Sequence, residues 1–262
     1  MIDFVRKDSY SLNDLEHIVS ILRAPGGCPW DGEQTHESLR RGMLEESYEV
    51  VEAIDEGDAS HLKEELGDVL LQVVFHADIE KDAGRFTLDD VADGICKKLI
   101  FRHPHVFGDV SVSGSDEVLV NWEALKREEK GQETYSDTLT SVAHSLPALW
   151  RAEKVQKKAK KAGFDWPDAT GAMDKLSEEL EELKQAVAEN SNVAEELGDL
   201  LFAAVNVSRF VKVDPEETLT AATDKFISRF EKVEHLAVQA GRDMAEMSLD
   251  ELDTLWNKAK RT

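Results

Sequence analysis

Two acidic strings each occur twice in this chain, in the same order, and this repeat limits its possible folds more than any other feature. EESYE at 45–49 returns as EELEE at 178–182, which is 133 residues later, and EELGD at 64–68 returns at 195–199, which is 131 residues later. Two further pairs repeat with their spacing of four residues kept: Lys98 and Arg102 return as Lys225 and Arg229, and Trp122 and Lys126 return as Trp256 and Lys260. Several matches in one order indicate a tandem duplication.

Apolar residues recur with the period of an α-helix through most of the sequence, and alternating β-type runs are scarce. The pattern predicts an all-α fold with helices at 39–56, 60–80, 87–101 and 117–130, and again at 145–162, 171–189, 193–211, 215–240 and 248–260. The polar stretch at 131–140 has no apolar period and is predicted to be a linker. We therefore expect one helical domain at 1–130 and a second, built from the same unit, at 141–262.

The formal net charge of −23, from 31 Lys and Arg against 54 Asp and Glu, narrows the range of partners. Such a surface repels nucleic acid and anionic membranes, so we expect the protein to bind neither. The apolar runs are too short to cross a bilayer, the first residues show no secretory pattern, and Cys28 and Cys96 are expected to be reduced. These features favour the cytoplasm. A nucleotide would approach so acidic a chain only with a divalent cation and a local cluster of Lys and Arg.

The acidic strings have the spacing of a metal site. Residues three apart share a helix face, so Glu179 lies beside Glu182, and Glu196 lies beside Asp199. If the two helices pack antiparallel through the short connection at 190–192, the four carboxylates converge and repel one another. A hard divalent cation with oxygen ligands, such as Mg²⁺ with Mn²⁺ as a possible substitute, would remove that repulsion.

A solvated helix face is the alternative reading of any single acidic string of this kind. Three features favour the metal site. The second acidic pair opens the apolar segment 200–205, which is expected to be buried, and an unpaired carboxylate there would be costly. The two-part pattern also occurs twice. Finally, Gly67 and Gly198 hold the same place in both copies, although a mid-helix glycine costs about 1 kcal/mol relative to alanine.

The required basic cluster is also present. Lys225 and Arg229 lie one helical turn apart, an arrangement suited to phosphate oxygens, although an exposed helix face would show the same spacing. Trp256 precedes Lys260 by four residues and is either a core anchor or a residue that stacks on a base or closes the site. Only the repetition of both pairs favours the functional interpretation.

The combined strings resemble the MazG proteins of the all-alpha nucleoside triphosphate pyrophosphohydrolase superfamily. The resemblance covers nearly the whole chain and includes GCPWD at 27–31, RHPHVF at 102–107, GFDW at 163–166 and the segment from Lys225 to Phe230. It implies hydrolysis of a nucleoside triphosphate to the monophosphate and pyrophosphate, with Mg²⁺ and usually as a homodimer. It also implies that the C-terminal copy is the catalytic one.

The resemblance carries functional roles onto matching positions of this sequence. The implied metal ligands are Glu179, Glu182, Glu196 and Asp199. In the mechanism that we expect, one glutamate, either Glu178 or Glu179, orients or deprotonates the attacking water. The positions expected to bind the nucleotide are Lys175, Glu178, Glu195, Asn206, Lys225, Arg229, Trp256 and Lys260. The first copy has the matching residues Glu46, Glu49, Glu65, Asp68, Lys98, Arg102, Trp122 and Lys126.

One difference between the copies is visible in the sequence. Asn206 lies seven residues after Asp199, on nearly the same helix face, and aligns with Phe75 in the first copy. An amide there would contact the sugar or base of a nucleotide, and its loss would disable the first copy. Two other functions stay open at this stage: a non-catalytic Mg–nucleoside triphosphate sensor that acts through a protein partner, and a purely structural helical assembly.

Overall fold

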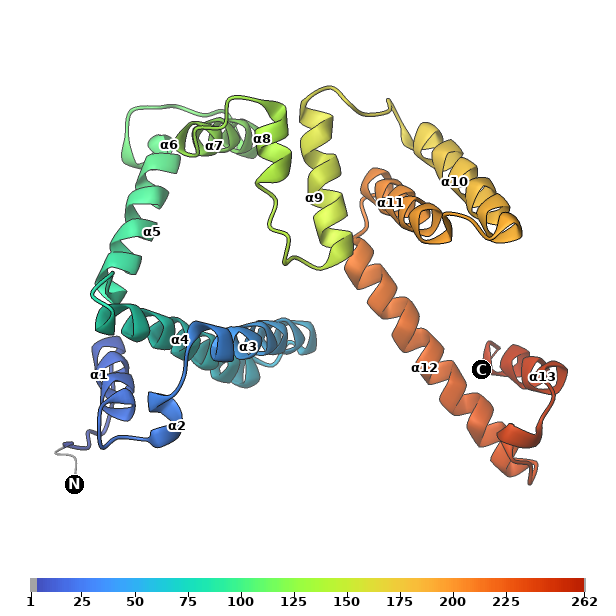
Figure 1. Cartoon of the computed structure of the whole chain (residues 1–262), viewed down its shortest axis with the longest axis horizontal. Coiled ribbons are helices and arrows are strands. Elements are labelled where there is room, and N and C mark those ends of the chain that lie inside the picture. Colours follow the sequence, from blue (N-terminus) through green and yellow to red (C-terminus); the bar gives the residue numbers. More distant parts are fainter. Residues whose placement is uncertain (1–3, 262) are drawn as a thin grey trace. The chain divides into compact units, whose positions relative to one another are not determined.

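The computed structural model describes residues 4–261, and it divides into two compact units, Met1–Lys126 and Arg127–Thr262. Every regular element in the described part of the chain is a helix, which confirms the predicted all-α class. Figure 1 shows these helices along the sequence. The division falls close to the end of the predicted first domain at residue 130.

The first unit contains seven helices over its described residues. They are α1 (Leu12–Arg23), α2 (Pro29–Gly32), α3 (His36–Glu56), α4 (Ala59–Asp82), α5 (Leu88–Arg102), α6 (Pro104–Phe107) and α7 (Ser115–Glu129), the last of which ends just past the boundary. The acidic strings lie on α3 and α4, which form an antiparallel pair. Gly57 ends α3 with a φ of 69°, a left-handed conformation that glycine adopts without steric cost.

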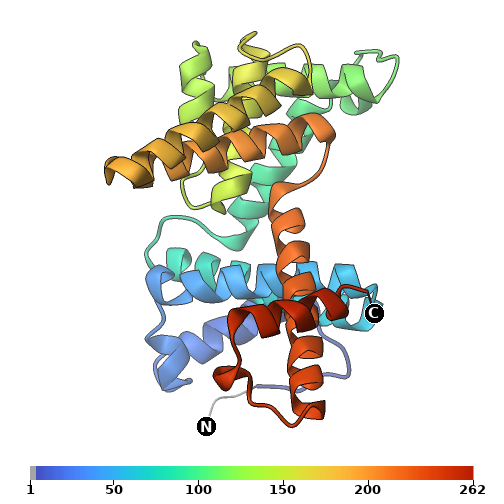
Figure 2. The same ribbon diagram turned by 90° about the vertical axis from the view of Figure 1, so that its right-hand side faces the viewer.

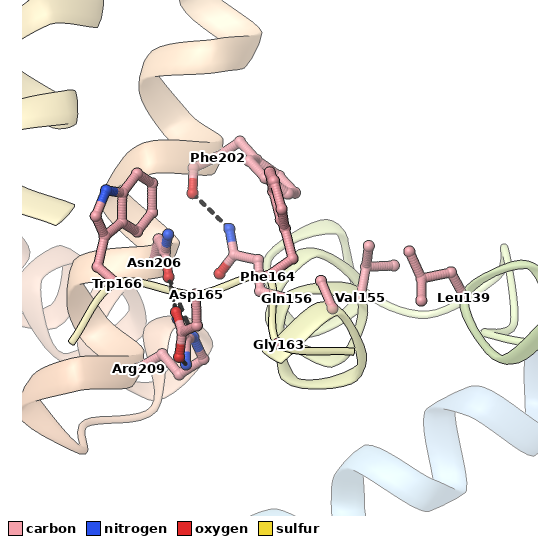
Figure 3. Close-up of a pocket in the computed structure, with 11 residues that line it drawn as sticks. Leu139, Val155, Gln156, Gly163, Phe164, Asp165, Trp166, Phe202, Asn206 and Arg209 are labelled. Atoms are coloured by element: carbon pink, nitrogen blue, oxygen red, sulfur yellow. Dashed lines mark hydrogen bonds and ion pairs between the residues drawn. The ribbon is translucent and has the colours of Figure 1, made fainter. Parts of the chain in front are cut away.

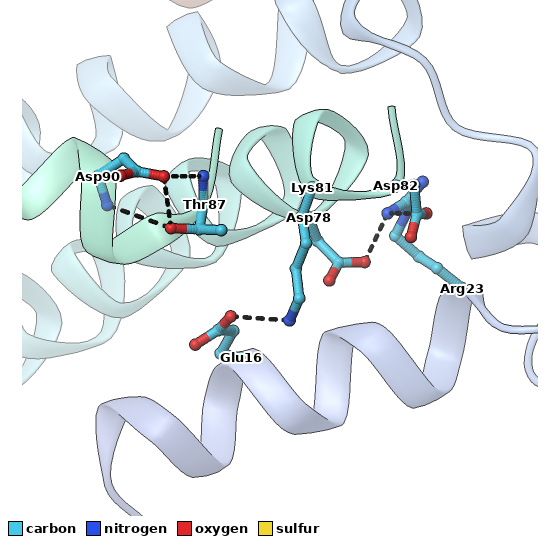
Figure 4. A network of polar contacts seen from close by, with 7 residues as sticks. All are labelled: Glu16, Arg23, Asp78, Lys81, Asp82, Thr87 and Asp90. Carbon is cyan, nitrogen blue, oxygen red and sulfur yellow. Dashed lines mark hydrogen bonds and ion pairs between the residues drawn. The ribbon is translucent and has the colours of Figure 1, made fainter. Parts of the chain in front are cut away.

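Helix α1 covers one face of α4 and completes the small core of this unit. Val19 of α1 and Val74 of α4 are fully buried, and they pack with Leu39 and Phe75. Ion pairs hold α1 in place: Arg23 contacts Asp78 at 2.5 Å, and Figure 4 shows this pair with its neighbours Asp82, Lys81 and Glu16. Because both members of the Arg23–Asp78 pair are nearly out of solvent, breaking it would leave a buried charge unpaired.

The second unit repeats the central helix pair and again has helices before and after it in the sequence. Its elements are α8 (Tyr135–Thr140), α9 (Ala148–Lys161), α10 (Ala169–Glu189), α11 (Val193–Val211), α12 (Pro215–Gln239), the 3₁₀ turn η1 (Met244–Glu246) and α13 (Leu249–Ala259). Figures 1 and 2 both show α10 and α11 side by side and antiparallel. Asn190 and Asn192 make the connection with φ values of 53° and 50°, and asparagine tolerates this left-handed region better than most residues.

Three expectations about the helices require correction. Helix α1 was absent from the predicted set, although Ser11 and Asp14 form a complete capping box at its start. The predicted linker at 131–140 contains α8, because Thr134 and Asp137 form another capping box. The segment 200–205 is only partly buried: Leu201 is 51% exposed, whereas Val205 is 2% exposed. Helices α9 and α10 both pack on α11 but leave part of its apolar surface open.

Candidate active site

Three carboxylates of the second copy converge between α10 and α11. Side-chain oxygens of Glu179, Glu196 and Asp199 lie within 4.8 Å of one another. Glu179 is buried, Glu196 is half-buried and Asp199 is exposed. The cluster forms because the i,i+3 spacing of Glu196 and Asp199 places both on the α11 face turned toward Glu179 of α10. Glu182, the fourth predicted ligand, lies outside this group of three and is exposed.

Lys175 partly neutralises the negative charge of this cluster. Its Nζ lies 2.7 Å from a carboxylate oxygen of Glu178 and 2.7 Å from one of Glu179. Hydrogen bonds to these two carboxylates, first Glu178 and then Glu179, raise the pKa of Lys175. The structure therefore brings three of the predicted nucleotide and catalytic positions, Lys175, Glu178 and Glu179, together on adjacent turns of α10.

Burial and like charge both act on Glu182 at the edge of the cluster. Desolvation and the nearby Glu179 carboxylate raise the pKa of Glu182 above its usual value of 4.5. A raised carboxyl pKa means that the ionised form is disfavoured where the negative charges gather. A cation at this position would reverse that preference.

The first copy repeats the carboxylate cluster on α3 and α4. Oxygens of Glu46, Glu49 and Glu65 lie within 4.8 Å of one another, and Glu65 is buried. Desolvation, followed by the charges of Asp68 and Glu49, raises the pKa of Glu46. Here His61 Nε2 lies 3.3 Å from Glu65, whereas a lysine contacts the buried glutamate of the second copy.

The predicted basic and aromatic residues of the second copy lie apart from its acids. Lys225 and Arg229 are on α12 and Trp256 is on α13, and these two helices pack chiefly against each other. Within residues 4–261, no ion pair joins Lys225 or Arg229 to the carboxylates. The Trp256 ring instead lies 5.1 Å from the Phe226 ring, and Lys260 Nζ lies 3.4 Å from Oδ1 of Asn257.

The matching residues of the first copy form a more closed cluster. Arg102 is buried at the end of α5, and its guanidinium carbon lies 5.5 Å from the centre of the Trp122 ring. Lys126 Nζ lies 4.9 Å from the same ring. Cation–π contacts thus hold both basic residues on the indole, while Lys98 stays exposed on α5.

Asn206 borders a cavity of about 500 Å³ between α8, α9 and α11 (Figure 3). Its Oδ1 accepts hydrogen bonds from Arg209 at 3.1 and 2.7 Å, and Arg209 in turn donates to Asp165 at 2.9 Å. The remaining lining includes Gln156 and the aromatic residues Phe164, Trp166 and Phe202. Asn206 was predicted from its difference from Phe75, whereas Gln156 and Arg209 were not predicted, although Arg209 differs in the same way from its aligned residue, Asp78.

The donor set suits a hard divalent cation. All three converging atoms in each copy are carboxylate oxygens, which Mg²⁺ and Mn²⁺ prefer, and there is no thiol or imidazole among them. Three ligands leave coordination positions for water and phosphate oxygens. The fit rests on this chemistry and on the excess negative charge of the cluster.

The chain is therefore an all-helical protein with two copies of a carboxylate cluster, one on each antiparallel helix pair. The profile of the MazG nucleotide pyrophosphohydrolase domain matches residues 34–107 and 169–234, which are the two copies of the acidic helix pair with their flanking segments. The chain belongs to this family, and the predicted resemblance and tandem duplication are confirmed.

Three bacterial proteins are similar to this chain over almost its whole length. It is 48% identical over 248 residues to the nucleoside triphosphate pyrophosphohydrolase/pyrophosphatase MazG of Thermotoga maritima, covering 94% of this chain and 95% of that protein. It is 42% identical over 258 residues to the nucleoside triphosphate pyrophosphohydrolase of Escherichia coli K12, covering 95% and 98%. It is also 51% identical over 256 residues to the uncharacterized protein YabN of Bacillus subtilis, covering 97% of this chain and 52% of YabN.

Proposed function

We propose that this protein is a Mg²⁺-dependent pyrophosphohydrolase that converts nucleoside and deoxynucleoside triphosphates to the monophosphate and pyrophosphate. The observation that carries the proposal is the convergence of Glu179, Glu196 and Asp199 within 4.8 Å, with Lys175 beside them. The names of the relatives in Thermotoga maritima and Escherichia coli support turnover over mere sensing of the nucleotide.

Glu179, Glu196 and Asp199 would hold the cation, with Glu182 joining them once its repulsion from Glu179 is relieved. When bound, Mg²⁺ supplies charge neutralisation at the phosphates and a bound water of lowered pKa. Mn²⁺ is expected to substitute, because it accepts the same oxygen ligands.

Four further side chains would activate the water and bind the phosphates. Glu178 is more exposed than Glu179, with 58% of its side chain accessible against 8%, and it would orient or deprotonate the attacking water. Lys175 would release Glu179 to the cation and contact a phosphate oxygen. Lys225 and Arg229 would stabilise the charge that builds on the departing pyrophosphate.

Because α12 and α13 carry their basic residues away from the acids of the same copy, we expect the complete nucleotide site to need helices from a second copy. The apolar faces support this: Leu201, Phe202, Phe226 and Phe230 are each at least 45% exposed in the single chain. Such surface in a chain of this size marks an interaction site. We therefore expect a homodimer.

We also expect the enzyme to act in the cytoplasm and to bind no nucleic acid, given its net charge of −23. No helix of the described residues is long and apolar enough to cross a membrane.

The test is product analysis with a panel of nucleoside and deoxynucleoside triphosphates. The proposal expects equimolar monophosphate and pyrophosphate with Mg²⁺ and loss of turnover with EDTA. Release of orthophosphate and the diphosphate would contradict it. Light scattering at micromolar concentration tests the assembly, and a monomeric mass would contradict the homodimer.

A further inference from the structure

The cavity beside Asn206 lies next to the carboxylate cluster along one face of α11. Asp199 and Asn206 lie seven residues apart on α11 and therefore point to nearly the same side of the helix, with Glu196 three residues before them and Arg209 three residues after. At a rise of about 1.5 Å per residue, Asn206 lies about 10 Å along the axis from Asp199. A nucleotide that bound its phosphates at these carboxylates would therefore extend its nucleoside end toward this cavity.

A chain of polar contacts fixes the direction of the Asn206 amide. Arg209 occupies the amide oxygen with two hydrogen bonds, and Asp165 holds Arg209 in a two-point contact of opposite charges. The asparagine is only 8% exposed, so it has little freedom to rotate. The amide nitrogen is left as the group that can donate to a molecule in the cavity.

Gln156 supplies the complementary atom from the opposite side. It is 5% exposed, and its Nε2 donates to the carbonyl oxygen of Phe202 at 2.8 Å, as Figure 3 shows. Its Oε1 is buried without a hydrogen-bond partner in the described structure. A buried acceptor without a donor is unfavourable, and a ligand that donates to it would remove the cost.

The walls around these two amides are aromatic. Phe164, Trp166 and Phe202 are 83%, 40% and 45% exposed, so their rings are accessible. Trp166 lies directly against Gly171, where a Cβ atom would collide with the indole ring. The indole is therefore fixed at the start of α10. Flat apolar walls with a few placed polar groups are typical of a site for a planar ligand.

We propose that this cavity binds the nucleobase of the substrate, with Asn206 donating to a base acceptor and Gln156 accepting from a base N–H. The inference rests on the proposed function for the position of the phosphates. It assigns Gln156 as a residue that determines base preference, because each base presents a different arrangement of donors and acceptors to two fixed amides.

The experiment compares Gln156→Leu with Gln185→Leu, which makes the same chemical change on the exposed face of α10. KM and kcat are measured for ATP, GTP, CTP and UTP, and inorganic tripolyphosphate serves as an inhibitor that has no base. We expect Gln156→Leu to raise KM for at least one nucleotide about tenfold or more, with kcat and tripolyphosphate inhibition unchanged. Gln185→Leu should change none of these values.

Equal KM values for wild type and Gln156→Leu with all four nucleotides would overturn the inference. So would weaker inhibition by tripolyphosphate, because the substitution would then act on the phosphates. If Gln156→Leu does not fold, Trp166→Ala is measured by the same criteria.

Equilibrium dialysis with nucleoside monophosphates, using ribose 5-phosphate as the compound without a base, separates this inference from the proposed function. If the wild type hydrolyses no triphosphate but still binds a monophosphate more tightly than ribose 5-phosphate, and Gln156→Leu loses that difference, the base site stands while the proposed activity fails. No difference in the wild type would overturn the base site.

Discussion

In the first unit, the helix face beyond the acids is filled by Phe75, which is 5% exposed and packs with Val19, Leu39 and Val74. In the second unit the aligned residue, Asn206, borders a cavity of about 500 Å³. The ion pair three residues further along the helix also differs, because the charge that the helix contributes has the opposite sign in the two units. Asp78 of α4 pairs with Arg23 in the first unit, and Arg209 of α11, at the aligned position, pairs with Asp165 in the second.

The comparison indicates that duplication preserved the helix pair and its carboxylates while the surroundings changed. In the first copy, α1 and its ion pair close an apolar core over α4. In the second, the same place is a lined cavity, and a lysine stands where the first copy has Gly42, since 175 minus the offset of 133 gives 42. We infer that one copy became a structural unit and the other kept the chemistry.

The largest expected effect comes from the carboxylates. Glu182→Gln and Asp199→Asn should each lower kcat roughly 10²–10³-fold, because each removes a charge that holds the cation at the reacting phosphates. The matched changes Glu49→Gln and Asp68→Asn should leave most activity. Pyrophosphate release under saturating Mg²⁺ measures both sets. If the first-copy variants are the inactive ones, the assignment of the copies is reversed.

Exchanging the aligned residues Phe75 and Asn206 should affect the free energy of unfolding in the first unit and nucleotide binding in the second. Phe75→Asn should destabilise the protein by about 3 kcal/mol or more, since it opens a cavity and buries an amide in the core. Asn206→Phe should change the free energy of unfolding much less and raise KM about tenfold, because it fills the cavity. Denaturant titration and steady-state kinetics give the two values. Similar stability losses from both changes would show that the two places are equivalent.

Lys175→Met tests the lysine that only the second copy has. It should raise KM about tenfold through loss of a phosphate contact, while Gly42→Lys in the first copy should leave kcat and KM unchanged. Isothermal titration with a non-hydrolysable nucleotide checks the affinity directly. Unchanged affinity in Lys175→Met would restrict this lysine to balancing charge in the metal-free protein.

The smallest effect is a pH dependence confined to the first unit. Desolvation, and then His36, lowers the pKa of His76 below 6.5. The Nδ1 atoms of the two rings lie 2.7 Å apart, and Glu80 contacts Nε2 of His36 at 2.5 Å with Arg85 beside it. A depressed folded pKa contributes stability that is present above the unfolded value and is lost as pH falls through the folded one.

Hydrogen exchange at about pH 7.5 and about pH 5.5 measures this effect in each unit separately. Protection of α3 and α4 should weaken at the lower pH, and that of α10 and α11, where Val207 stands at the aligned position, should change less. His76→Val should remove the difference. An equal loss of protection in both units would exclude His76 as its source.

The sequence predicted the parts of the fold that repeat. The acidic strings specified the helix pairs and their faces, because helical spacing alone decides which carboxylates meet. Helix α1 and helix α8 were missed because their capping boxes, at Ser11 and Thr134, do not recur at aligned positions of the other copy. The burial predicted for 200–205 was wrong for Leu201 and Phe202, since burial depends on which neighbours cover a face and not on local hydrophobicity.

The site was predictable to a similar degree. The convergence of Glu179 with Glu196 and Asp199 follows from periodicity and a short connection. The place of Lys225, Arg229 and Trp256 relative to the acids does not, because it depends on how α12 and α13 pack. Gln156 carries no local signal at all: only the packing of α9 on α11 gives its amide a role.

The most direct test of the copy assignment is calorimetric binding of an α,β-non-hydrolysable nucleoside triphosphate with Mg²⁺ to three proteins. These are the wild type, the double variant Glu49→Gln/Asp68→Asn and the double variant Glu182→Gln/Asp199→Asn. We expect the wild type and the first variant to bind with the same affinity and the second variant to lose Mg²⁺-dependent binding. Retained binding in the second variant together with loss in the first would contradict it.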